Sequence, residues 1–177
     1  MHRHAREMAL ALALCLAMSG AAARAQTAAA PPPVCEPRST AAPGRLNVSG
    51  HAGSFGMIPP CEGGLGFSIA RNTPLRSVEG TIRVRGPSGD LPREVGMRLD
   101  LSANATGMLI GDHRVARVPD LRCTDLSITL VVARCEDARG ARIGCPAIRV
   151  TRTSVFERLS VAGEGLDICH DAEANRP

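Results

Sequence analysis

Short runs in which apolar and polar residues alternate constrain the fold of this chain more than any other feature. From Val95 to Leu101, for example, every second residue is apolar and the residues between them are Gly, Arg and Asp. Successive side chains of an extended strand point to opposite faces of a sheet, so this period of two predicts strands with one buried face. Runs of this kind lie at residues 46–49, 65–70, 78–85, 95–102, 126–133, 148–150 and 159–161.

Turn-forming residues separate these runs. Pro, Ser, Gly and Asp occupy positions 87–90, and a second turn signal, Asp-Ala-Arg-Gly, occupies positions 137–140. No long stretch shows the i, i+3, i+4 apolar spacing of a surface helix. Many short strands without crossover helices favour an all-β fold, an antiparallel β-sandwich, over a parallel α/β sheet.

The beginning of the chain has the layout of a secretory signal peptide. A basic start is followed by an apolar run from Met8 to Met18, and Ala23-Arg24-Ala25 fits a cleavage site before Gln26. The next segment is rich in Ala and Pro and lacks periodicity, which indicates an extended conformation. We therefore expect an exported protein, periplasmic or extracellular. Its expected parts are a signal peptide (1–25), an Ala/Pro-rich extended segment (26–44), a β-sandwich domain (45–169) and a flexible tail (170–177).

Six cysteines remain after the predicted cleavage, and none of them belongs to a Cys-x-x-Cys pair. An even number in an exported chain implies disulfide bonds, whereas a redox site or a zinc ribbon needs closer pairs. The sequence by itself does not select one pairing. Cys135 and Cys145 flank the turn signal at 137–140, and Cys35 and Cys169 lie near the two ends of the expected mature chain. The pairing that we expect is Cys135–Cys145, Cys35–Cys169 and Cys61–Cys123, and the alternative is that one pair stays reduced.

Composition argues against several functional classes. All 21 cationic residues are Arg, and the charges nearly balance once the basic leader is removed, so no basic surface for nucleic acid or an anionic membrane is indicated. Three Phe are the only aromatic residues, which leaves little for stacking on bases. No apolar run reaches the roughly 18 residues needed to cross a bilayer. We expect no nucleic-acid partner, no membrane span after signal cleavage and no cofactor.

Ser54 has the most suggestive setting for a catalytic nucleophile. The segment 50–56 resembles a G-x-S-x-G elbow, but Ala takes the place of the first Gly and no helix is expected to follow. His51, His113 and His170 are the available bases, and their separation in the sequence argues against a metal site. We therefore assign no catalytic and no metal residue. A small periplasmic serine hydrolase that uses Ser54 with one of these histidines remains an alternative.

Arg83 and Arg85 share one face of the strand expected at 78–85. A guanidinium group offers fork-shaped donors and an apolar plane, and Arg is enriched in protein–protein interfaces. We name these two residues as a candidate binding face, with a solvated sheet face as the alternative.

Between residues 60 and 163 the chain carries, in this order, Cys61, the run ending at 82–84, the turn at 87–90, the strand at 95–101, the segment 104–106, Cys123 and Gly140. The order of these elements resembles the IrmA-like family, the secreted bacterial mimics of interleukin receptors. The resemblance implies an immunoglobulin/fibronectin-III-like sandwich, a disulfide placed like Cys61–Cys123, and dimers that bind cytokines or otherwise contact the host. Four further cysteines are additional to the pattern of that family, and no binding residue is carried over.

These observations lead to one functional expectation and two alternatives. We expect an exported, non-enzymatic β-sandwich that acts through protein–protein contact, with a host protein as one possible class of partner. Open strand edges invite pairing, so a homodimer is also expected. The alternatives are a subunit of a cell-envelope or surface assembly, which would accept a donated strand, and the serine hydrolase described above.

Overall fold

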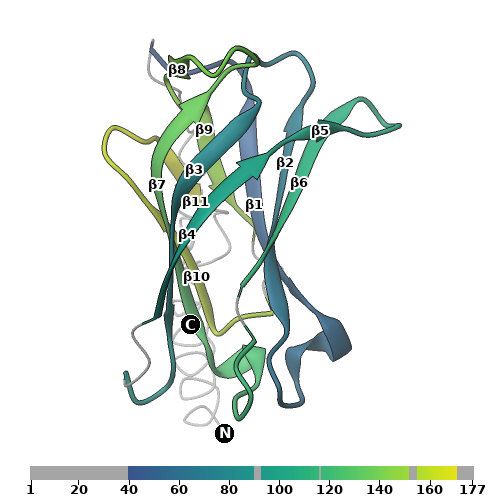
Figure 1. Cartoon of the computed structure of the whole chain (residues 1–177), viewed down its shortest axis with the longest axis vertical. Helices are drawn as coiled ribbons and strands as arrows, with labels where there is room; N and C mark the ends of the chain where they lie inside the picture. The colour runs from purple at the N-terminus through teal and green to yellow at the C-terminus, as the bar shows by residue number, and fades with distance from the viewer. Residues whose placement is uncertain (1–39, 90–92, 116, 152–154, 171–177) are drawn as a thin grey trace, which may run out of the picture. The chain divides into compact units, whose positions relative to one another are not determined.

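The structure is a computed structural model that describes residues 40–89, 93–115, 117–151 and 155–170. All of these residues belong to one compact unit of the chain, which begins at Pro32. They form two β-sheets and no α-helix, so the predicted all-β sandwich is confirmed (Figure 1). Within the described residues, no helix is long and apolar enough to cross a membrane. The predicted signal peptide, residues 26–39 and residues 171–177 lie outside the described part of the chain.

The larger sheet has six strands in the order β11–β9–β1–β2–β6–β5. Its antiparallel centre is formed by β1, β2 and β6, and their register sets Ser49 opposite Gly66 and Gly66 opposite Asp112. These strands therefore carry small and polar residues side by side on one face. The strands are Arg45–Ala52 (β1), Gly63–Ala70 (β2), Ser102–Ala103 (β5), Met108–Arg114 (β6), Ala147–Val150 (β9) and Ile168–His170 (β11).

The smaller sheet follows the path β10–β7–β3–β4, and β8 is attached to β7. Pairing between β3 and β4 has a constant register, whereas pairing between β3 and β7 shifts between Glu79 and Gly80. The strands are Ser77–Arg85 (β3), Arg93–Asp100 (β4), Ser127–Glu136 (β7), Arg142–Ile143 (β8) and Arg158–Ala162 (β10), and two short 3-10 helices cover Gly53–Gly56 (η1) and Cys123–Asp125 (η2).

The residues that alternate in the sequence supply the core between the two sheets. In β1, Leu46 and Val48 are fully buried, while the residues between them are half-buried and face outward. The core is mainly aliphatic because the chain has so few aromatic residues, and Phe67 and Phe156 are its buried aromatic side chains. Burial of apolar surface of this kind is the dominant stabilising contribution in such a fold.

Strand β6 was not among the predicted strands, and its inward positions explain the omission. Its inward face carries Leu109, Gly111 and His113, so the apolar alternation is interrupted. A Cβ on Gly111 would lie within 3.0 Å of Leu99 and Leu101 side-chain atoms, which shows that this glycine makes room for core residues. Ile110 further obscures the alternation, because it is a large apolar residue at an outward, exposed position.

Three strand pairs are parallel, namely β1 with β9, β9 with β11, and β7 with β10. The other named pairs, including the long ones between β3 and its two neighbours, are antiparallel. The parallel strands come from the last part of the described chain, which adds strands next to β1 and β7. Side-chain alternation has a period of two in either direction, so the sequence pattern could not distinguish parallel from antiparallel pairing.

Two disulfides agree with the expected pairing. Cys61 is bonded to Cys123, with a Cα–Cα distance of 4.7 Å, and joins the segment before β2 to η2, which precedes β7. Cys135 is bonded to Cys145 across the β7–β8 hairpin. Cys169 is also disulfide-bonded, and its expected partner Cys35 lies outside the described residues.

Candidate binding site

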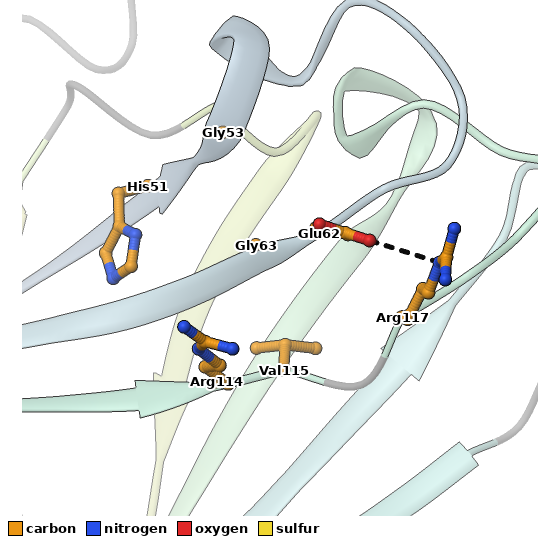
Figure 2. A pocket seen from close by; sticks show the side chains of 7 residues that line it. All are labelled: His51, Gly53, Glu62, Gly63, Arg114, Val115 and Arg117. Carbon is orange, nitrogen blue, oxygen red and sulfur yellow. Dashed lines mark ion pairs between the residues drawn. The ribbon is translucent and has the colours of Figure 1, made fainter.

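An open hollow lies where β1, β2 and β6 meet η1 at one end of the larger sheet (Figure 2). Its volume is about 440 Å³, and four of its lining residues carry polar or charged side chains. The hollow is therefore a wet, open depression of the kind that a side chain or small group of a partner can enter. It is lined by His51, Gly53, Glu62, Gly63, Arg114, Val115 and Arg117.

A contact between the side chains of His51 and Asp112 borders the hollow. The imidazole Nε2 of His51, on β1, contacts a carboxylate oxygen of Asp112, which is on β6. The two strands are separated by β2, and the ring reaches across it because β2 has glycines at the positions between them. A Cβ on Gly64 would come within 2.7 Å of a carbon of the His51 ring, so any other residue there would displace the ring.

Two guanidinium groups enter the hollow from the end of β6 and the loop that follows it. The Nε of Arg117 lies 3.1 Å from a carboxylate oxygen of Glu62, and this ion pair is drawn in Figure 2. The Arg114 side chain is exposed, lies between His51 and Val115 in the same view, and makes no hydrogen bond or ion pair to another described residue. Glu62 therefore balances Arg117, whereas no described residue balances the charge of Arg114.

The chemistry of this arrangement suits an anionic group. A guanidinium binds a carboxylate or a phosphate through two parallel N–H donors, and Val115 adds a buried apolar wall beside it. Among the described residues, no three metal-ligating side chains converge.

The residues of the hydrolase alternative are only partly brought together. Ser54 lies in η1, three residues after His51, and its side chain is outside the described part of the structure. His113 is half-buried and opposite Leu65, and so projects from β6 on the side away from Asp112. His170 ends β11, and its side chain is also outside the description. The observed partner of Asp112 is His51 on β1, and not the adjacent His113.

The candidate face on the smaller sheet is exposed but partly neutralised. Arg83 and Arg85 both project from the outer face of β3, opposite Thr129 and Ser127 of β7. The Nε of Arg83 lies 2.7 Å from a carboxylate oxygen of Glu94 on β4. Arg85 is exposed and makes no ion pair with another described residue.

Further along the same face, four charged residues form a closed network that we call the Glu136 cluster, which consists of Glu79, Arg98, Arg134 and Glu136. The Glu136 side chain is only 7% exposed and is contacted by Arg98 at 2.9 Å and by Arg134 at 3.0 Å. It also accepts a 3.0 Å hydrogen bond from the Ser77 hydroxyl. Glu79 holds the other side of Arg134 at 2.6 Å. These charges satisfy one another, so the cluster is a structural element of the sheet.

Comparison of the chain with protein-family models, curated proteins and solved structures finds no match. The resemblance to the interleukin-receptor mimics therefore stays a prediction from the sequence, and the function has to be argued from the geometry of the molecule.

Proposed function

We propose that this chain is an exported, non-enzymatic protein that acts by contact with a protein partner, and that the partner places a carboxylate in the hollow beside His51 and Arg114. The observation that carries the proposal is the exposed guanidinium of Arg114, which no described residue neutralises, in a depression bordered by the His51–Asp112 pair.

Export is supported by the disulfides. Disulfide bonds persist in oxidising compartments and are rare in the cytosol, and this fold contains Cys61–Cys123 and Cys135–Cys145. They agree with the signal peptide that the sequence predicts. A host protein is the first class of partner to test, in line with the family that the sequence resembles, and a cell-envelope subunit is the second.

A contact function also agrees with the openness of the hollow. Chemistry on a bound substrate benefits from the exclusion of water, whereas His51 and Asp112 have side chains that are 48% and 55% exposed. Arg is one of the residues enriched in interface hot spots, and Arg114 lies in an open depression that a side chain of a partner can reach.

The test is affinity capture with the oxidised protein on a surface, using host and envelope extracts and quantitative mass spectrometry. The matched variants are Arg114→Gln and Arg139→Gln, since Arg139 is exposed in the β7–β8 turn, away from the hollow. We expect the wild type and the Arg139 variant to retain the same protein, the Arg114 variant to lose it, and a glutamate-rich peptide to compete. Equal retention by the Arg114 variant would contradict the site, and retention of no protein at all would contradict the function.

The serine hydrolase is a second candidate because the structure does bring one histidine to a carboxylate. In a triad, one imidazole nitrogen is held by a carboxylate and the other accepts the proton of the nucleophile. With Asp112 at Nε2 of His51, only Nδ1 is available to Ser54. A fluorophosphonate probe that labels the wild type but not Ser54→Ala would support this candidate, and absence of labelling at high probe concentration would end it.

A further inference from the structure

The outer edge of β4 is the longest strand edge for which the described residues supply no neighbour. β4 pairs with β3 along all of its eight residues and has no strand partner on its other side within the described chain. Such an edge presents a row of unused N–H and C=O groups that a further strand can pair with. The question is which strand fits.

The direction of the backbone groups along β4 follows from one hydrogen bond. The amide of Leu101, directly after β4, donates to the carbonyl of Arg76 beside β3 at 2.7 Å. Backbone groups alternate along a strand, so the odd-numbered residues of β4 face β3. The even-numbered residues Glu94, Gly96, Arg98 and Asp100 therefore direct their N–H and C=O groups to the open edge.

We infer that the strand that fits this edge is β4 of a second copy of the chain, antiparallel to the first, with a two-fold axis at Gly96. This arrangement sets Gly96 opposite Gly96, Glu94 opposite Arg98 of the second copy, and Arg98 opposite Glu94 of the second copy. All of these residues have outward backbone groups, so they form hydrogen-bonded pairs. The inference does not depend on the hollow or on the proposed function.

Charge complementarity selects this register from its neighbours. With the axis at Met97, Glu94 would face Asp100, and with the axis at Arg98 the two Arg98 side chains would face each other. Like charges directly opposite each other destabilise a strand pair, and opposite charges stabilise it. With the axis at Val95, Glu94 would face Gly96 and the favourable pair would be lost.

Ion pairs within each copy continue the charge complementarity beyond the two paired β4 strands. Within one copy, Arg83 pairs with Glu94, and Arg98 is contacted by Glu136 and lies 3.8 Å from Glu79. In the proposed register, positive and negative side chains therefore alternate across the interface. Arg83 and Glu94 of one copy are followed by Arg98 and Glu79 of the second copy. On the opposite face of the sheet, Val95 lies opposite Met97 of the second copy, so the apolar side of β4 continues across the two-fold axis.

The decisive experiment uses charge reversal at the two paired positions. The variant Glu94→Arg places Arg opposite Arg98, and the variant Arg98→Glu places Glu opposite Glu94, so each alone should weaken self-association by about a hundredfold. Mixed in equal amounts, the two variants have opposite charges at both positions and should form a heterodimer. Arg85→Glu changes a charge on the same face outside these pairs, so this variant should self-associate as strongly as the wild type.

Association is measured by analytical ultracentrifugation of the oxidised protein over a concentration series, with circular dichroism to verify folding. The variant Gly96→Pro is a second test that leaves the Glu136 cluster untouched. It removes an amide that faces the open edge and no amide that pairs with β3, so the folded monomer should persist while the dimer is lost. A wild type that stays monomeric up to millimolar concentration, a dimer that survives Gly96→Pro, or folded charge-reversal variants that fail to associate when mixed would each overturn the inference.

Discussion

The outer faces of the two sheets use the same kinds of charged residue in opposite ways. On the smaller sheet, Glu136 is almost fully buried and is satisfied by Arg98, Arg134 and Ser77. On the larger sheet, His51 and Asp112 contact each other and are about half exposed, and the nearby Arg114 side chain has no ion pair with a described residue. The side chains of the Glu136 cluster are paired with one another, whereas the site on the second face keeps hydrogen-bonding capacity for a ligand.

The residues of the strands between the charged groups account for this difference. Arg98, Glu79 and Arg134 lie on the adjacent strands β4, β3 and β7 and are direct register partners, so their side chains meet without a gap. His51 and Asp112 lie on strands separated by β2, whose glycines place no side chain between them. Whether a sheet face carries a closed charge network or an open site therefore depends on the residues of its middle strand. Glu79 on β3 bridges its neighbours, whereas the glycines on β2 do not.

Removal of Glu136 should have the largest effect on stability. Glu136→Ala leaves two guanidinium groups and a hydroxyl without their shared acceptor, and we expect the free energy of unfolding to fall by about 2–3 kcal/mol. The matched change on the other face, Asp112→Ala, removes an exposed partner and should cost less than about 1 kcal/mol. Urea unfolding of both variants with unchanged m-values measures the difference, and equal losses would remove the distinction between the two faces.

Substitution of Gly64, the β2 glycine that the His51 ring crosses, should have the next largest effect on stability. In Gly64→Ala, the new Cβ meets the His51 ring and the carbonyl of His113, and we expect a loss of about 1 kcal/mol together with separation of His51 from Asp112. Gly96→Ala is the control on the smaller sheet, because a Cβ there meets nothing within 4 Å, and its stability should be unchanged or rise by about 0.5 kcal/mol. NMR chemical shifts of the His51 ring report its movement. Unchanged shifts in Gly64→Ala would show that the absence of a side chain at Gly64 is not what lets the ring reach Asp112.

Arg114→Gln should separate binding from stability. The Arg114 side chain makes no hydrogen bond or ion pair with a described residue, so the free energy of unfolding should stay within about 0.5 kcal/mol of the wild type while partner capture is lost. Thermal unfolding alongside the capture assay makes the comparison. A clearly destabilised Arg114 variant would mean that this guanidinium has a structural role as well.

The smallest effect is expected at an exposed ion pair outside both faces. Two hydrogen bonds of 2.8 Å from the Arg122 guanidinium hold the pKa of the Asp125 carboxyl below its ordinary value. A depressed pKa in the folded state means that the pair adds stability above the ordinary pKa of Asp, near 4, and that this contribution disappears as the pH falls through the folded value. The stability difference between wild type and Asp125→Asn should therefore be present at pH 6 and shrink on acidification, as followed by urea unfolding at several pH values. A difference that grows toward low pH would contradict the direction of the shift.

The sequence was sufficient for the strands whose inward positions are apolar. The alternation at β1, β2, β3, β4, β7, β9 and β10 is carried by aliphatic residues, and hydrophobic burial requires that pattern at those positions. β6 was missed because Gly111 and His113 occupy inward positions. The candidate site was missed for a different reason, since Asp112 and His51 are far apart in the chain and Asp112 has a histidine, His113, as its direct neighbour.

By itself, the sequence determined the fold class and the turn positions, because local periodicity and turn chemistry act over short distances along the chain. Two of the expected disulfides are present, but the sequence alone did not select their pairing. Only the tertiary structure decided which charges meet. Strand order and register depend on contacts between distant segments, and they brought His51 to Asp112 across Gly64, closed the Glu136 cluster and left the edge of β4 open.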